Sequence, residues 1–417
     1  MLDSDAAPPV LVTTPREGSV DVIADATALR KFIDHIDPNL PVAVDAERAQ
    51  SFRYSSKAYL IQFRQEGIGT HLIDPIALAD PSLLADLTQL SDALSGCVWV
   101  LHAASQDLAC LAEVGLVPRR LFDTELAGRL LGLDRVSLSP MLTRYLGIEL
   151  AKTHSADDWS RRPLPPSWLT YAALDVDYLL DLRQAVIADL NDTGKMDWAK
   201  QEFDDVLARF AVDPSDSDDR WRSLKGIGRL RRPRDLAVAQ NLWEVRDELA
   251  RQIDIAPRRI LTDNDLVSAA AAFGHMKPSA VHDAIGSQPG FMGRLARRQR
   301  RRWVSAVDSA LEDDSSHWPN RPSGRSTPPP RLWERTNPAA AKRWVLARAA
   351  VIEVAEANNV PVENLMTVAT LGEVMWPDGA NFSEAGLRES FAKANARPWQ
   401  IELVAPAVAK VLARDGK

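Results

Sequence analysis

An apolar run that ends in two carboxylates places the strongest constraint on this chain. Residues 42–47 read VAVDAE, so that three apolar residues are followed by Asp45 and, two positions later, by Glu47. In a β-strand, side chains at i and i+2 point to the same face, so the segment predicts a buried strand with both carboxylates on one face. Two neighbouring like charges repel each other unless something neutralises them. The spacing therefore indicates either a solvated strand edge or part of a site for a divalent cation held by oxygen ligands.

The segments around this strand predict a mixed α/β sheet flanked by helices. Residues 58–63 and 70–73 read as further strands, and Gly67 and Gly69 predict a short turn between them, as in an antiparallel meander. Residues 97–101 form an apolar run whose length is typical of a buried strand. Helices are expected over residues 81–95, 138–146 and 167–188, with Asp25 or Thr27 capping an earlier one.

Two further groups of polar residues have both a structural and a functional interpretation. Asp107 follows the strand at 97–101 and is either an acid in the first turn of a helix capped by Ser105 or a third carboxylate at a strand end, where α/β proteins place their sites. Tyr171 and Asp175 lie one helical turn apart on one face. They form either a surface pair or a fourth carboxylate with a hydroxyl that orients water. His102 is expected to be a strand-end histidine with satisfied hydrogen bonds rather than a ligand.

Length and composition indicate an ordinary globular protein of more than one domain. The chain has 417 residues, which favours two or three domains, and 46% of them are hydrophobic. Cys97 and Cys110, its two cysteines, provide neither a disulfide framework nor a cysteine-based metal site. Residues 1–20 lack the pattern of a signal peptide, and no apolar run reaches the ~18 residues of a membrane span. We therefore expect a cytoplasmic protein that does not contact membranes.

The net charge of −7 conceals two regions of opposite sign. Residues 1–210 contain 19 Lys and Arg against 31 Asp and Glu, whereas residues 211–417 contain 31 against 26. Within residues 220–302 the balance is 18 against 8. A basic segment attached to an acidic half predicts a nucleic-acid partner, because the phosphate backbone dominates such affinities; a solvated basic surface is the alternative.

Three motifs, taken in order, resemble those of the DEDDy branch of the DEDD exonuclease superfamily. They are Asp45-x-Glu47, Asp107 and Tyr171-x-x-x-Asp175. The text between them is similar to ribonuclease D in residues 58–62 (AYLIQ), 100–108 (VLHAASQDL) and 158–164 (DWSRRPL). Two small departures are Ala46, where Thr is common, and Asp157, where Ser often precedes the Asp-Trp pair; they affect neither the carboxylates nor the tyrosine.

The resemblance implies a ribonuclease H-like exonuclease domain that hydrolyses nucleic acid with two divalent ions, Mg²⁺ or Mn²⁺. It implies that Asp45 is shared by both ions, that Glu47 and Asp175 complete the first site, and that Asp107 serves the second. Tyr171 is expected to orient the attacking water. The implied reaction removes one nucleotide at a time from a 3′ end and releases 5′-monophosphates. RNA with a free 3′ end, such as a tRNA precursor, is the implied substrate.

The C-terminal half resembles the HRDC domain, a small helical bundle, and shows a weak internal repeat. Trp243 followed by Pro257 is echoed by Trp344 followed by Pro361, so two all-α HRDC-type bundles are expected after the exonuclease domain. The expected order is a loose leader (1–20), the exonuclease domain (21–210), an acidic linker (211–219), the first HRDC domain (220–315), a Pro/Ser/Arg linker (316–331) and a divergent HRDC-like domain (332–417).

Arginines concentrate in the first of these bundles and are the candidates for phosphate contacts. They are Arg231, Arg232, Arg234, Arg297, Arg298, Arg300 and Arg301. The sequence leaves two alternatives open, a DNA-directed 3′→5′ exonuclease and an RNA-binding scaffold without activity. It contains no Gly-x-x-x-x-Gly-Lys-Ser/Thr loop, so no nucleotide cofactor is expected. The protein is expected to act as a monomer.

Overall fold

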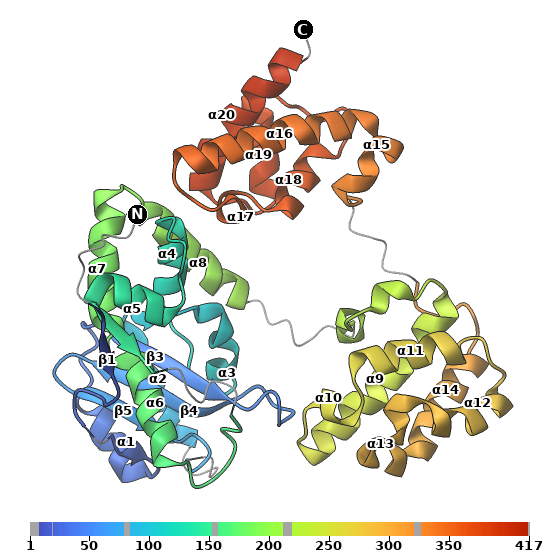
Figure 1. Ribbon diagram of the computed structural model, residues 1–417, viewed down its shortest axis with the longest axis horizontal. Coiled ribbons are helices and arrows are strands. Elements are labelled where there is room, and N and C mark those ends of the chain that lie inside the picture. The colour runs from blue at the N-terminus through green and yellow to red at the C-terminus, as the bar shows by residue number, and fades with distance from the viewer. Residues whose placement is uncertain are drawn as a thin grey trace. The chain divides into compact units, whose positions relative to one another are not determined.

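The computed structural model describes residues 8–18, 20–78, 84–151, 157–211, 219–320 and 327–415. The chain forms two compact units (Figure 1). The first combines residues 1–48, 57–212 and 326–417, and the second combines residues 49–56 and 213–325. Residues 81–83 and 152–156 and most of both expected linkers lie outside the described residues.

A six-stranded mixed sheet forms the centre of the first unit, as the sequence predicted. Its order is β2-β5-β4-β3-β6-β7. The central β3 pairs antiparallel with β4, and β4 pairs antiparallel with β5, which confirms the expected meander. The remaining pairs are parallel. The strands are β2 (Val22–Ile23), β3 (Val42–Arg48), β4 (Ala58–Gln65), β5 (Gly69–Ile73), β6 (Trp99–Leu101) and β7 (Leu121–Asp123).

Helices cover this sheet, and one of them brings the third motif to it. Helix α6 (Pro166–Asp177) packs across β3, β4 and β5 (Figure 1). The expected single helix over 167–188 is two helices, because Tyr178 (φ −114°, ψ 6°) leaves the helical region before α7 (Leu179–Asp192) begins. Helix α1 (Ala26–Ile33) is capped by Asp25. The unit also contains α2 (Leu84–Ala93), α3 (Leu108–Ala112), α4 (Thr124–Leu130), α5 (Leu138–Leu146) and α8 (Met196–Ala211).

The N-terminal segment is not the loose leader that we expected. Strand β1 (Val10–Val12) pairs in parallel with β8 (Ile148–Leu150). The Arg16 backbone N–H donates to the buried Asp177 carboxylate at 2.9 Å. Polar and proline residues predicted a loop here, but a short strand needs only a partner edge, which comes from a segment distant in the sequence.

The two helical regions repeat one order of elements. In the second unit these are α9 (Pro233–Ile253), α10 (Pro257–Ile260), α11 (Asp263–Phe273), α12 (Pro278–Ala284), α13 (Arg294–Arg298) and α14 (Arg300–Glu312). In the first unit, after the short α15 (Trp333–Thr336), they are α16 (Pro338–Ala357), α17 (Val362–Leu365), α18 (Val368–Met375), α19 (Glu384–Lys393) and α20 (Pro398–Asp415). Each begins with a long helix followed by a single turn opened by proline or its neighbour, which agrees with the expected repeat.

The helices were also compared with the requirements of a membrane span. Within the described ranges, none combines the length and the apolar character needed to cross a bilayer.

Candidate active site

The first and third motifs meet on β3. Asp45 and Glu47 lie two residues apart on this strand, and α6, which carries Asp175, packs against it. Carboxylate oxygens of these three residues all lie within 4.8 Å of one another. The period of the strand and the packing of one helix therefore assemble three acidic side chains that are separated by up to 130 residues in the sequence.

Asp107 joins the cluster from the end of β6, the parallel neighbour of β3. It follows a left-handed residue, Ala103 (φ 63°), and a single 3₁₀ turn, and its side chain is hydrogen-bonded to that of Asp45. Its side chain makes no cap hydrogen bond to α3, and Ser105 lies in the 3₁₀ turn rather than capping that helix. The geometry thus favours the functional interpretation of Asp107 over the helix-start interpretation.

A buried residue outside the motifs, Asp123, fixes the turn that presents Asp107. Its carboxylate accepts hydrogen bonds from the backbone N–H groups of Ala103 (3.0 Å) and Ala104 (2.8 Å). The same carboxylate caps α4, as the sequence predicted. His102 contacts Thr124 at 2.9 Å through Nδ1, and burial lowers its pKa to about 4. His102 is therefore neutral at pH 7 and acts as a satisfied strand-end histidine.

The loop that precedes α6 holds Tyr171 in place. Trp159 is fully buried and packs against the ring of Tyr171 with a centroid distance of 6.4 Å. Arg162 anchors this loop to the sheet, since its guanidinium donates to Asp74 at 2.6 and 2.8 Å and to the Tyr59 carbonyl at 2.6 Å. The segment 158–164, which carried part of the resemblance, is thus a support for Tyr171.

Burial and mutual repulsion raise the pKa values of the clustered carboxyl groups. The pKa values of Asp45, Glu47 and Asp175 all lie above their ordinary values, and burial is the main cause. The pKa of Asp107 rises to about 8, first through burial and then through the nearby charge of Asp45. The pKa of Tyr171 is also raised by burial and by Asp175, so its hydroxyl remains protonated and can act only as a donor or an oriented acceptor.

This cluster fits divalent cations. Mg²⁺ and Mn²⁺ prefer oxygen ligands, and closely spaced carboxylates without a cation must take up protons to limit their repulsion, as the raised pKa values indicate. Asp45, Glu47 and Asp175 could hold one ion directly. Asp107, through its position beside Asp45, could contribute to a second. When bound, such ions activate water and stabilise the leaving oxygen of a phosphodiester.

The sequence interpretation missed Arg48, a cation beside the cluster. Its guanidinium donates to the Gln106 carbonyl at 2.5 Å and lies 3.7 Å from a carboxylate oxygen of Asp107. Its charge lowers the pKa values of Asp45, Glu47 and Asp107. Strand alternation would direct Arg48 away from Glu47, but the register of β3 and β4 shifts between these residues and re-aims the side chain.

The structure separates the candidate arginines into two groups in the second unit. Helices α9 and α14 run antiparallel, because Asn241 bonds to Ala306 and Glu248 pairs with Arg302. Arg234 and its neighbours stand at the start of α9, roughly 20 Å along the helix from Glu248 and the second group. The first group is Arg231, Arg232 and Arg234, and the second is Arg297, Arg298, Arg300 and Arg301.

Comparison with protein families divides the chain in three. Residues 20–191 match the family described as 3′-5′ exonuclease, residues 235–273 match the HRDC domain, and residues 326–412 match the family described as 3′ to 5′ exonuclease C-terminal domain. An exonuclease domain and one HRDC domain are therefore confirmed. The two helical regions match different families, so a count of two HRDC domains stays a prediction.

Individual relatives carry one name. A protein of Bartonella henselae named Ribonuclease D is 33% identical over 233 residues, which cover 55% of this chain and 55% of that protein. Another Ribonuclease D, from Jannaschia sp., is 31% identical over 297 residues, which cover 68% of this chain and 72% of that protein. The match to the first of these relatives thus spans little more than half of its length.

Solved structures extend the similarity over nearly the whole chain. A protein from Bifidobacterium adolescentis is similar with a TM-score of 0.83 and 34% identity over 97% of this chain and all of the other. Escherichia coli RNase D, described as an exoribonuclease involved in structured RNA processing, has a TM-score of 0.71 over 95% of this chain and 99% of its own. Because its identity is 23%, this second likeness concerns the fold alone.

Proposed function

The chain belongs to the ribonuclease D family, and from this premise we propose that it is a metal-dependent 3′→5′ exoribonuclease that releases 5′-mononucleotides. One observation carries the proposal. The carboxylates of Asp45, Glu47 and Asp175 converge within 4.8 Å, with Asp107 hydrogen-bonded to Asp45 and Tyr171 hydrogen-bonded to Asp175. An intact set of oxygen ligands beside a protonated hydroxyl argues against a silent RNA-binding scaffold.

In this proposal the side chains have separate roles. Asp45 lies between the other carboxylates and is the ligand that two ions would share, with Glu47 and Asp175 on one side and Asp107 on the other. Mg²⁺ or Mn²⁺ suits these ligands. Tyr171 donates to Asp175, and its raised pKa prevents it from serving as a base at neutral pH, so it orients the attacking water.

The finer parts of the proposal concern substrate, location and assembly. We propose that the protein trims the 3′ ends of structured RNA, with tRNA precursors as the leading substrate, and that it acts in the cytoplasm as a monomer. The name Ribonuclease D carried by relatives and the description of the E. coli enzyme support an RNA substrate. We also propose the domain limits given above, including the divergent second HRDC-type bundle.

Labelled substrates test the reaction. The full chain is incubated with RNA labelled at the 5′ or the 3′ end, and with matching DNA, in the presence of Mg²⁺, Mn²⁺ or EDTA. We expect a descending ladder from 5′-labelled RNA, labelled mononucleotide from 3′-labelled RNA, and no reaction in EDTA. Internal cleavage or activity in EDTA would contradict the mechanism. Faster degradation of DNA would instead support the DNA-directed alternative.

The variant Asp45→Asn tests the site. It keeps the size of the side chain but removes the charge that both ions would share. We expect turnover to fall by more than about a hundredfold, since even the loss of a residue that only supports a ligand costs 10–100-fold. RNA affinity, measured by fluorescence anisotropy, should persist. Equal loss of binding and turnover would indicate misfolding or a mistaken role, and a thermal melt of the variant distinguishes these two outcomes.

A further inference from the structure

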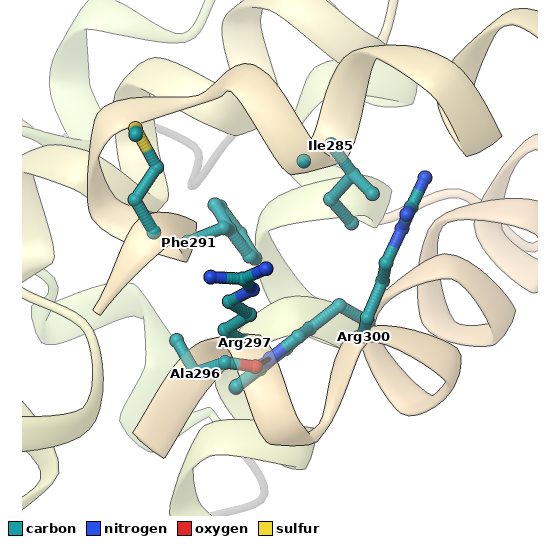
Figure 2. A pocket seen from close by; sticks show the side chains of 8 residues that line it. Ile285, Phe291, Ala296, Arg297 and Arg300 are labelled. Carbon is teal, nitrogen blue, oxygen red and sulfur yellow. Dashed lines mark hydrogen bonds between the residues drawn. The ribbon is translucent and has the colours of Figure 1, made fainter. Parts of the chain in front are cut away.

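A cavity in the second unit lies apart from the carboxylate cluster and has a different chemistry (Figure 2). Its volume is about 320 Å³, near the lower end of the roughly 300–1,000 Å³ of small-molecule sites. Ile285, Phe291 and Trp303 line it, and each of these side chains is less than 5% exposed. Met292, Arg297 and Arg300 complete the lining. We call this cavity the apolar–arginine pocket.

The apolar wall of the pocket is fixed by packing. The rings of Phe291 and Trp303 meet edge to face, with centroids 5.5 Å apart and an interplanar angle of 87°. The indole Nε1–H of Trp303 donates to the Ala296 carbonyl at 2.9 Å. Phe291 also contacts Phe273 in the core of the unit, at 6.2 Å. Such a wall is preorganised, so a ligand would not have to order it on binding.

The charged side of the pocket has donors to spare. Arg300 donates to the carbonyl of His282, and Figure 2 shows Arg297 directed into the space between Phe291 and Arg300. Within the described part of the chain, Arg297 and its neighbours Arg294 and Arg298 form no ion pair, whereas Arg302 is paired with Glu248. Each guanidinium carries five N–H donors, so Arg297 and Arg300 keep donors for an anion.

An open depression continues from the pocket. Its volume is about 490 Å³, and Met292, Arg294, Arg297 and Arg298 line it. Met292 and Arg297 belong to both hollows, so an anionic chain that leaves the pocket would pass along further guanidinium groups. The arrangement suits a polymer that carries an apolar group and regularly spaced negative charges.

We propose that the apolar–arginine pocket binds one unpaired nucleotide of an RNA, with the base against Phe291, Ile285 and Met292. The phosphates on either side contact Arg297 and Arg300. Unpaired bases are recognised by packing on aromatic side chains and on guanidinium planes, and phosphates by arginine donors. No side-chain acceptor lines the pocket, so it recognises the presence of a base rather than its identity. The inference rests on the proposed RNA substrate but concerns a second contact with it.

The test separates the base from the phosphates. Gly286→Leu fills the pocket without changing its charge: a Cβ at Gly286 would stand 3.7–3.9 Å from the Arg300 guanidinium, which is ordinary contact. Arg297→Gln removes a charge inside the pocket, and Arg298→Gln, as a matched control, removes one that lines only the adjoining depression. All three are made in the full chain carrying Asp45→Asn, so that RNA is bound without being degraded.

Anisotropy is measured with an RNA that has a single-stranded 3′ segment, and with versions that carry one abasic position at a time. We expect an abasic nucleotide at one position to weaken binding about tenfold. Gly286→Leu should weaken binding of the intact RNA to a similar extent, abolish this dependence on the base, and leave the salt slope unchanged. Arg297→Gln should lower both the affinity and the salt slope, and Arg298→Gln should lower the slope but keep the dependence on the base.

Several results would overturn the inference. Wild-type affinity of Gly286→Leu, with unchanged melting temperature, would show that the pocket is not used. Equal binding of all abasic RNAs would show that no base enters it. If 5′-AMP binds and Gly286→Leu abolishes that binding alone, the site holds free mononucleotide instead of RNA. Failure of the proposed function is distinguishable, because it appears in the degradation assay with wild-type protein and leaves these binding results in place.

Discussion

The two helical regions share an order of helices but direct corresponding side chains to different partners. At the start of α20, Arg397 donates to Glu202 of α8 at 2.6 and 2.9 Å, and the Trp399 indole donates to the same carboxylate at 2.8 Å. At the start of α14, Trp303 bonds only within its own region, and Arg297 just before it has no ion pair among the described residues. One region uses its arginine and tryptophan for docking, and the other leaves arginines available.

Charge follows the same division. Residues 220–315 carry 18 basic and 12 acidic side chains, whereas residues 332–417 carry 10 of each. A neutral bundle can pack on an acidic domain without competing for phosphates, while a basic bundle attracts them. The comparison teaches that fold alone does not decide which bundle binds nucleic acid; the partners of a few arginines do.

The largest expected effect comes from breaking the docked contact. Glu202 is 4% exposed, and Glu202→Ala would leave Arg397 buried without its partner. Removing one member of a buried ion pair typically costs about 3–5 kcal/mol. We expect the melting temperature of the first unit to fall by several degrees and the C-terminal bundle to become sensitive to protease.

The matched control for this change is Glu248→Ala in the second unit. Glu248 pairs with Arg302, but their side chains are 45% and 34% exposed, so the loss should be about 1 kcal/mol or less. Equal destabilisation by both substitutions would mean that the Glu202 contact does not hold the bundle in place.

The two units should also differ in their response to pH, because arginines do not titrate in this range and the clustered carboxyl groups do. Asp107 has a pKa of about 8 in the folded protein against 3.8 for its ordinary value. The metal-free folded state therefore holds more protons than the unfolded state between about pH 4 and 8. Its free energy of unfolding should fall as pH rises through this window, by up to about 1.4 kcal/mol per pH unit for each proton.

Urea unfolding in EDTA at pH 5, 6, 7 and 8 measures this slope. Asp107→Asn should flatten it, since the amide does not titrate. Divalent ions should stabilise the protein more at pH 8 than at pH 5, because they compete with fewer protons. A slope of opposite sign in the metal-free protein would contradict the assigned shift.

Neutralising arginines tests the second half of the comparison. Replacing the second group with glutamine should weaken RNA binding by about threefold per lost phosphate contact at 200 mM salt relative to 50 mM, and should flatten the dependence on salt. The substituted residues are Arg297, Arg298, Arg300 and Arg301. Arg335 and Lys410, exposed residues of the C-terminal bundle, provide the control, and their loss should leave the slope unchanged. Equal slopes for both variants would remove the distinction between the bundles.

The sequence predicted those features that depend on local periodicity. The paired carboxylates on β3, the antiparallel meander and the end of α5 at Gly147 follow from residue spacing and from one glycine in the left-handed region. What escaped prediction depends on contacts between distant segments. Asp123 shapes the turn before Asp107 across 20 residues, and the antiparallel packing of α9 and α14 separates arginines that one composition count had grouped. The strand at Val10–Val12 likewise exists only because β8 offers an edge.

Arg48 offers the smallest expected effect and the sharpest view of the acidic site, where it reverses the pattern of the second unit by placing one cation among anions. Its guanidinium lies 3.7 Å from Asp107 and is 26% exposed, so water screens part of its charge. Arg48→Met should increase the affinity for Mn²⁺ in calorimetric titration by about three- to tenfold, because a positive neighbour no longer repels the ion. Arg48→Lys, which keeps the charge, should bind Mn²⁺ as the wild type does. Weaker Mn²⁺ binding by Arg48→Met would mean that Arg48 instead holds Asp107 in position through its bond to the Gln106 carbonyl, and that its contribution is geometric rather than electrostatic.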